Sequence, residues 1–345
     1  MNESTKSDLS QLIGLTCEQA LARAQIRGSR RCGPFGLALG FKSATLANVI
    51  EPLFPAACHK DHDLTIAFLN RRDLDLSNLI PNPPDAHHAV TVTADYYAAW
   101  WPGKRPVLHM LDKTACRGLV WFAADEAPCW ELSRPALPLI QAMSADTDWT
   151  PAHGAAVGKD GRFLLLAGEG RSGKTTAALA CAQAGWDYAG DDYVIANAKC
   201  RRVEPLYTSA RLRIDMAAAF AELVGSASSG ITDEDGDIRH ELRLAGVLPE
   251  QIRGGRLAAI LLPRRQGSPV PTFAPARRLD AYEALIKHTV QSLRSWHGLL
   301  SVKLADLVGC APTLFVETGT DPALVPPALG ALLDRIGDQP ASRCR

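Results

Sequence analysis

Apolar residues recur at helical spacing through residues 1–30, and this spacing predicts one amphipathic N-terminal helix. The apolar face of this helix is formed by Leu9, Leu12, Ile13, Cys17, Leu21 and Ala24. From residue 33 to about residue 125 the pattern changes to short extended runs, separated by Pro, Gly, Asp and Asn. The runs are PFGLALGF, DLTIAFLN, AVTVTADYY, PVLHML and GLVWFAA. The sequence therefore predicts a domain over residues 1–148 that consists of a helix and a β-rich lobe.

The pattern of residues 149–345 differs, because apolar runs of strand length alternate there with helix-forming segments. HGAAVGKDGRFLLLAG contains two extended runs joined by a glycine-flanked turn, which is typical of a β-hairpin. Pairing Gly158 with Gly161 in this hairpin places His153 opposite Leu166. The segment TTAALACAQA is a good helix former that ends at Gly185. This alternation of strand and helix predicts an α/β domain.

The composition of the chain limits the kinds of partner that we expect it to bind and the cellular compartment in which we expect it. Lys and Arg total 37, and so do Asp and Glu, so the chain has no net charge with which to hold a nucleic acid. No apolar run approaches the roughly 18 residues of a membrane-spanning helix, and the N-terminus does not resemble a signal peptide. The nine cysteines include no C-x-x-C pair. We expect a cytoplasmic protein without nucleic-acid or membrane partners, and a homo-oligomer stays open.

Three groups of residues outside the main motif suggest metal chemistry but fit it poorly. Cys58, His59 and His62 lack a fourth ligand and match no common zinc spacing, and His87 and His88 follow a proline-rich turn. The acidic run 232–242 resembles a calcium loop. However, a count from Asp233 puts isoleucine at the glycine position and leucine at the glutamate position. We expect no metal site at any of the three.

Residues 168–175 match the pattern G-x-x-x-x-G-K-[ST], between an apolar run of strand length and a helix-forming segment. In that context backbone N–H groups at the start of a helix surround the phosphates of a nucleotide, and a lysine neutralises them. The hydroxyl after the lysine reaches Mg²⁺. The motif predicts that ATP and Mg²⁺ bind here. The residues expected to contact the nucleotide are Gly168, Glu169, Gly170, Arg171, Ser172, Gly173, Lys174, Thr175 and Thr176.

Two adjacent acids, Asp191 and Asp192, follow one helix later in the apolar stretch WDYAGDDYVIA. Burying two carboxylates is costly without a cation, and Mg²⁺ with its nucleotide would supply one. Successive side chains of a regular strand point to opposite faces, so only one aspartate would then share the metal with Thr175. A bulge or bend would bring both to the site.

These residues together resemble the catalytic core of HPr kinase/phosphorylase, whose fold is shared with phosphoenolpyruvate carboxykinase. The resemblance is specific over residues 149–196 and looser through the C-terminal 200 residues. With its Trp-containing β lobe, the chain is most similar to the HPr-kinase-related serine kinases of peptide natural-product clusters, including those for lasso peptides. Two positions depart from HPr kinase proper, which usually has glycine at Arg171 and glutamate at Thr176. The second departure argues against phosphorylase activity.

The resemblance implies that residues 149–345 form an HPr-kinase-like P-loop core with a mixed sheet. It also implies an ATP-dependent serine kinase that acts on a peptide or protein. By position it implies that Asp191, His153 and Lys174 are catalytic and that Thr175 and Asp192 hold Mg²⁺. Which aspartate accepts the proton of the attacking hydroxyl is left open. Two other functions stay open as well: a kinase for a small-molecule alcohol, and a regulatory module that binds ATP without turning it over.

Overall fold

A computed structural model describes residues 3–57, 61–79, 88–91, 93–232, 238–264, 267, 270–289 and 297–337. The described chain is mixed α/β and divides into two compact units. Unit 1 takes the described residues of Met1–Asp146, and unit 2 takes those of Thr147–Ser292 and His297–Arg345. None of the helices in these ranges combines the length and apolar content needed to cross a membrane.

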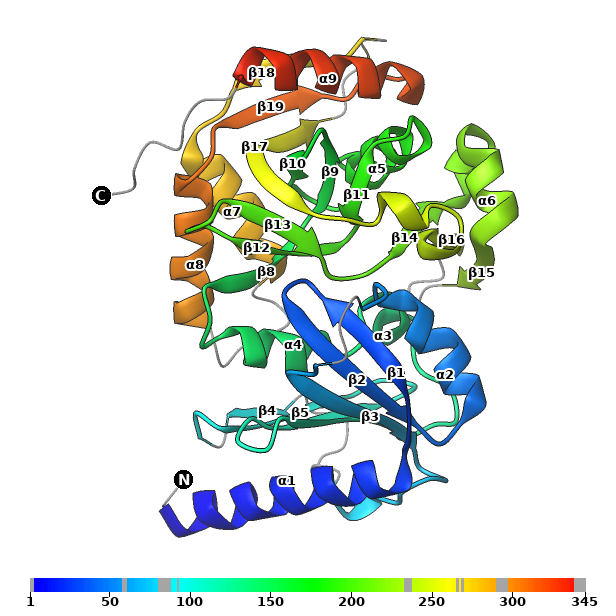
Figure 1. Cartoon of the computed structure of the whole chain (residues 1–345), viewed down its shortest axis with the longest axis vertical. Helices are drawn as coiled ribbons and strands as arrows, with labels where there is room; N and C mark the ends of the chain where they lie inside the picture. The colour runs from blue at the N-terminus through cyan, green and yellow to red at the C-terminus, as the bar shows by residue number, and fades with distance from the viewer. Residues whose placement is uncertain are drawn as a thin grey trace. The chain divides into compact units, whose positions relative to one another are not determined.

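Unit 1 is built on one seven-stranded sheet (Figure 1). Its strand order is β1 (Gln25–Cys32), β2 (Phe35–Phe41), β3 (Leu64–Asn70), β7 (Arg117–Phe122), β6 (Val107–Asp112), β5 (Tyr96–Trp101), β4 (His88–Thr91). Four of the five predicted extended runs each supply one strand of this sheet, whereas AVTVTADYY contributes to both β4 and β5. The pairs β2–β3 and β3–β7 are parallel and the others antiparallel. The helices are α1 (Glu3–Arg23), α2 (Ala44–Ile50), α3 (Cys129–Ser133) and α4 (Leu137–Ser144).

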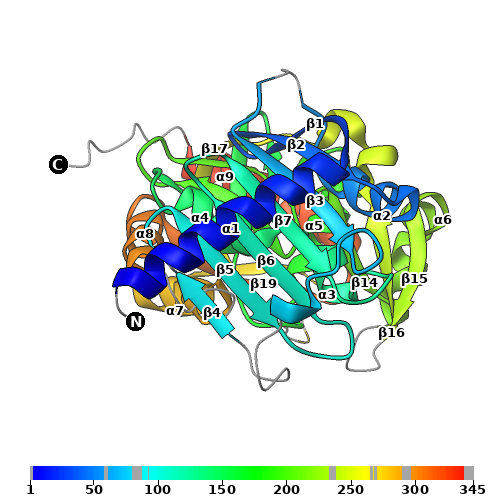
Figure 2. The same cartoon turned by 90° about the horizontal axis from the view of Figure 1, so that it is seen from below.

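Helix α1 lies across the sheet of unit 1 (Figure 2) and is shorter than predicted. It packs through Ile13, Cys17 and Ala20, which are buried with the apolar residues of β3, β6 and β7. Leu12 was expected on this face but is 38% exposed. The helix ends at Arg23, because the chain from Gln25 onward pairs with β2 as an edge strand instead of continuing the helix.

Unit 2 contains a nine-stranded mixed sheet and a separate three-stranded sheet. The main path of the larger sheet is β11 (Asp187–Gly190), β9 (Ala155–Lys159), β10 (Arg162–Leu166), β17 (Gly255–Arg264), β13 (Arg202–Pro205), β12 (Tyr193–Asn197), β8 (Trp149–His153). Strand β19 (Thr313–Glu317) also pairs with β17, and β18 (Thr272–Pro275) pairs with β19. The smaller sheet has the order β14 (Ser209–Arg213), β16 (Ile238–Arg243), β15 (Ser228–Thr232).

Successive side chains of β10 point into two different hydrophobic cores, one on each face of the sheet. Both faces of this strand are therefore buried, which explains why its sequence is continuously apolar. Leu164 and Leu166 are buried with α5 (Lys174–Gln183) and α9 (Val325–Ile336). Phe163 and Leu165 are buried with α7 (Arg278–Thr289) and α8 (His297–Gly309). The large sheet is therefore covered on both faces, and β10 leads from its middle directly to α5. The remaining helix of unit 2 is α6 (Ala221–Ala227).

The β9–β10 hairpin forms as predicted, but its register differs by two residues. Lys159 pairs with Arg162, so Asp160 and Gly161 make a two-residue turn with φ values of 52° and 72°. This is the left-handed backbone that an Asp-Gly turn adopts. Leu166 therefore pairs with Ala155 and not, as predicted, with His153.

Candidate functional site

The glycine-rich loop, residues 168–173, connects β10 to α5. Gly168 and Gly173 have φ values of 158° and 107°, which other residues rarely adopt. Lys174 is the first residue of α5 and only 7% exposed, and its Nζ donates to the carbonyls of Gly168 at 2.8 Å and Glu169 at 3.0 Å. Burial lowers the pKa of Lys174, while the nearby carboxylates of the site oppose this effect. The amine is therefore held over the loop.

Arg171 lies at the tip of this loop with φ at 67°. A left-handed backbone at a residue with a Cβ costs roughly 1–2 kcal/mol. HPr kinase proper usually has glycine at this position, and glycine would adopt this backbone conformation without strain.

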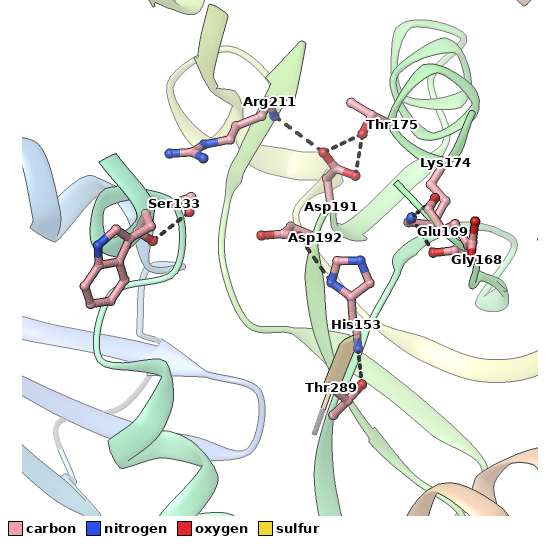
Figure 3. A network of polar contacts seen from close by, with 11 residues as sticks. Ser133, His153, Gly168, Glu169, Lys174, Thr175, Asp191, Asp192, Arg211 and Thr289 are labelled. Atoms are coloured by element: carbon pink, nitrogen blue, oxygen red, sulfur yellow. Dashed lines mark hydrogen bonds and ion pairs between the residues drawn. The ribbon is translucent and has the colours of Figure 1, made fainter. Parts of the chain in front are cut away.

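The two aspartates lie between β11 and β12, where the chain leaves regular strand geometry. The pairing of β11 with β9 shifts register between Tyr188 and Gly190, and Gly190 has φ at 146°. Asp192 is itself left-handed, with φ at 69°. Figure 3 shows that the Asp191 side chain points toward Thr175 and that of Asp192 toward His153.

Asp191 is 5% exposed and accepts hydrogen bonds from two donors. The Thr175 hydroxyl lies 3.0 Å from both of its carboxylate oxygens, and the backbone N–H of Arg211 donates to Oδ2 at 3.4 Å. Burial raises the pKa of Asp191 to about 6, and the negative charge of Asp192 adds to the rise. The hydrogen bond from Thr175 and the charge of Lys174 oppose it. The contacts from Thr175 and Lys174 therefore offset the cost of burying this carboxylate only in part.

His153 is the last residue of β8. It lies opposite Tyr193 of β12, and Tyr193 directly follows Asp192 in the sequence. Its Nδ1 is 3.2 Å from Asp192 Oδ1, and its backbone N–H donates to Thr289 Oγ1 at 2.9 Å. The next residue, Gly154, donates its N–H to the Asp192 carbonyl at 2.9 Å. A Cβ on Gly154 would lie 2.6 Å from the carbonyl oxygen of Leu166. Glycine at this position therefore allows the close approach that brings His153 beside Asp192.

A cavity of about 430 Å³ opens beside the loop and the first turn of α5. Its lining contains five cationic side chains and no acidic one among the described residues: Arg171, Lys174, Arg211, Arg213 and Arg239. Three of these arginines come from β14 and β16, and sequence reasoning assigned them no role. The signal that could have found them is the alternation of basic and apolar residues in SARLR and IRHELR, which is typical of a half-buried strand.

The residues predicted for the site all belong to unit 2. The structure pairs Thr175 with Asp191, whereas the sequence analysis assigned Thr175 and Asp192 to Mg²⁺ together. No cluster of three or more His, Cys, Asp or Glu residues within the described ranges has the arrangement of a metal site. Cys58, His59 and His87 lie outside those ranges, as do residues 233–237 of the acidic run 232–242.

The donor atoms at the loop fit a magnesium nucleotide. Mg²⁺ prefers hard oxygen ligands and is usually held by one or two carboxylates together with phosphate oxygens and waters. Thr175 and Asp191 offer a hydroxyl and a carboxylate 3.0 Å apart at the start of α5. Lys174 and the N-terminus of α5 offer positive charge for phosphates.

Comparisons with known proteins add little to this geometry. No family model matches the chain, and no curated protein matches it. Among solved structures, the Hpr(Ser) kinase/phosphatase from Coxiella burnetii is similar, with a TM-score of 0.27 and 10% identity. The similarity covers 55% of this chain and 99% of that one. A TM-score this low does not establish a shared fold, so function is inferred from the site itself.

Proposed function

We propose that the protein is an ATP-dependent phosphotransferase that transfers the γ-phosphoryl group to a serine hydroxyl of a peptide or protein. One observation carries this proposal: a buried lysine, a hydroxyl–carboxylate pair and a histidine–carboxylate pair meet at a cationic cavity at the start of α5. Phosphoryl transfer depends mainly on positioning and on charge stabilisation, and these groups supply both.

The loop and Lys174 bind the phosphates in this proposal. The first N–H groups of α5 have no partner within the helix and are available to phosphate oxygens. Lys174 exchanges its two contacts with loop carbonyls for contacts with the phosphates. Arg171 adds a second cation from the loop side of the cavity.

The pair Thr175–Asp191 holds the metal, which revises the assignment made from sequence. A hydroxyl and a carboxylate that already contact each other need little rearrangement to accept a cation between them. Mg²⁺ bound there offsets the negative charge of the phosphates. Because Asp191 is buried and its pKa is raised, a cation there also relieves an unfavourable buried charge.

The pair His153–Asp192 serves the acceptor. Asp192 is less buried than Asp191, with 32% of its side chain exposed, so an incoming hydroxyl can reach it. We assign Asp192 as the group that accepts the hydroxyl proton, and His153 as the residue that orients it. The 3.2 Å contact between Nδ1 and Oδ1 provides that orientation.

A smaller cavity of about 250 Å³ suits the base of the nucleotide. It shares Gly173, Thr176 and Met216 with the cationic cavity, so the two are continuous. Its remaining lining is largely apolar and includes Pro322 and Val325. Apolar walls with a few hydroxyls are typical of sites that enclose a small ring system.

Strand β14 is the part of the small sheet that contacts the acid pair, so we place the acceptor beside it. It has one strand neighbour, β16, within the described part of the chain. On its other side the Arg211 N–H donates to Asp191, and the Ser209 carbonyl accepts from the Tyr188 hydroxyl. Because these backbone groups are already bonded, the acceptor would meet the side chains of β14 and would not pair with its backbone as an added strand.

Mass spectrometry after incubation with Mg²⁺ and ATP tests the proposal. We expect phosphate on serine in a degenerate serine-peptide library and none on sugars or small alcohols. Asp192→Asn should lower turnover at saturating Mg²⁺ about 100-fold or more, whereas Asp191→Asn should raise the Mg²⁺ concentration needed. Asp160→Asn, at the hairpin turn, is the matched control and should change neither.

Three outcomes would count against the proposal. Phosphorylation of small alcohols with peptides inert would favour a small-molecule kinase. ATP binding without any transfer would favour a nucleotide-sensing module. Equal and mild defects in the two variants would show that the acid pair takes no part in the reaction.

A further inference from the structure

We propose that the acceptor carries an anionic oxygen group of its own, a carboxylate or a phosphate, which binds Arg213 and Arg239 beside the reacting hydroxyl. This inference rests on the proposed function and adds the chemical class of the acceptor. It is drawn from the polar face of the β14–β16 sheet.

The two faces of this sheet differ sharply in chemistry. Ala210, Leu212 and Leu242 point into the core of unit 2. The alternate residues form the opposite face: Arg211, Arg213, Arg239, Glu241 and Arg243. Four arginines on two short strands are far more positive charge than solubility requires, and three of them line the cavity of Lys174.

The arginines extend beyond the position of the transferred phosphate. Arg211 lies at the end of the cavity where we place the phosphoryl transfer, since its backbone N–H donates to Asp191. Arg213 lies two residues further along β14, about 7 Å away at the rise of a strand, and is paired in register with Arg239. A single phosphoryl group is too small to contact both Arg211 and the Arg213–Arg239 pair. The Arg213–Arg239 pair therefore faces a second anionic group.

The polar face is also held in place by carboxylates. Asp215 binds the Arg213 guanidinium through Nε at 3.0 Å and Nη2 at 2.9 Å. Glu241 is only 2% exposed and lies opposite Arg211 in register. Its Oε2 is buried and accepts no hydrogen bond within the described part of the chain. Burial raises the pKa of Glu241, and the charges of Arg211 and Arg243 oppose the rise. The Asp215 contacts therefore orient the Arg213 guanidinium before any ligand arrives.

The nucleotide already has its cations on the other wall. The loop side of the cavity supplies Arg171, Lys174 and the first N–H groups of α5. The side chains of the β14–β16 wall are therefore left for the acceptor. Guanidinium forks match carboxylate and phosphate oxygens in pairs, so they select for an anionic neighbour of the hydroxyl. Because the chain as a whole has no net charge, selection of an anionic acceptor depends on this local cluster of arginines.

Calorimetry on the full chain, saturated with Mg²⁺ and the non-hydrolysable analogue AMP-PNP, tests this inference. The probes are three blocked pentapeptides, each with a central serine flanked by two aspartates, two asparagines or two phosphoserines. We expect the aspartate or phosphoserine peptide to bind at least tenfold more tightly than the asparagine peptide. Which of the two binds better identifies the anionic group.

Arg213→Gln combined with Arg239→Gln should abolish this preference and change AMP-PNP affinity less than about twofold. Arg202→Gln is the matched control, because Arg202 is also paired with the acid two residues later but lies outside the cavity lining. Equal binding of all three peptides, or a preference that survives the double substitution, would overturn the inference. Failure of AMP-PNP itself to bind would instead refute the proposed function.

Discussion

Asp191 is the residue at which stability and function conflict most directly. Its carboxylate is buried beside a second acid, and the contacts from Thr175 and Lys174 compensate only in part, as its raised pKa shows. A neutral side chain in the same place would be less costly to bury, which is why we propose a binding role for this carboxylate.

We expect Asp191→Asn to stabilise the ligand-free protein at neutral pH. The pKa of Asp191 rises from 3.8 to about 6 on folding, so between these values the folded state keeps a proton that the unfolded state releases. The contribution of Asp191 to stability is complete below about pH 3.8 and is lost as the pH rises through about 6. Removing the charge should raise the free energy of unfolding by up to about 3 kcal/mol at pH 7.

Urea denaturation of wild type and Asp191→Asn between pH 4 and pH 8 measures this effect. The difference between the two proteins should grow with pH across that window and then level off. Asp160→Asn, at the exposed hairpin turn, serves as control. A difference that stays constant with pH would show that the Asp191 carboxylate is not penalised in the folded state.

Residue identities at the site were largely predictable, and their pairing was not. Lys174 and Thr175 follow from a motif, and Asp191 and Asp192 from two acids in an apolar stretch. The partner of Thr175 depends on the left-handed backbone at Asp192 and on the bulge before Gly190. These are tertiary features that no local pattern encodes.

At the scale of elements, the β9–β10 hairpin is fixed by glycines that make room for one ring. Phe163 is fully buried in β10. A Cβ on its cross-strand partner Gly158 would lie 2.5 to 2.7 Å from the ring, and a Cβ on Gly255 would lie 2.7 Å from it. Glycine on both sides of Phe163 therefore allows β9, β10 and β17 to pack together just before the loop.

We expect Gly158→Ala to destabilise the protein by about 2 kcal/mol, because overpacking a core typically costs 1–3 kcal/mol. Thermal or urea unfolding measures the change. Gly246→Ala is the control, since a Cβ there meets no atom within 4 Å and its backbone is not left-handed. Phe163→Leu should recover part of the loss in a double-mutant cycle. Equal stability of the two alanine variants would contradict this explanation of the hairpin.

Sequence patterns located most elements of the hairpin region but not their register. The end of α5 was predictable, because Gly185 adopts φ at 85° and the Trp186 N–H donates to the Cys181 carbonyl at 3.0 Å. The hairpin turn was placed one residue too early, which shifts the strand pairing by two residues, because Gly158, Asp160 and Gly161 allow more than one turn. The pairing of β17 with β10 joins residues far apart in the sequence, and no local signal reports it.

At the scale of the whole molecule, the chain contains separate hydrophobic cores. One belongs to unit 1 and is formed by α1 and the seven-stranded sheet. Two belong to unit 2 and lie on the two faces of the nine-stranded sheet. Each unit therefore contains a hydrophobic core of its own.

Two calorimetric unfolding transitions are expected from this division. Leu119→Ala in β7 and Leu329→Ala in α9 remove matched side chains that are fully buried. Each should lower one transition by about 5–15 °C and leave the other in place. Mg²⁺ with AMP-PNP should raise only the transition that Leu329→Ala lowers. A single transition shifted by both variants would show that the two units unfold together.

Equilibrium binding of AMP-PNP to the full chain in the presence of Mg²⁺ tests the central claim most directly, since every proposed role depends on a nucleotide at the glycine-rich loop. We predict saturable binding at one site in the wild type and at least tenfold weaker binding in Lys174→Met, which loses the cation that meets the phosphates. Lys159→Met, at the exposed end of β9, should bind as the wild type does. Absence of saturable binding by the wild type, or equal affinity in Lys174→Met, would contradict the claim that this loop binds a nucleotide.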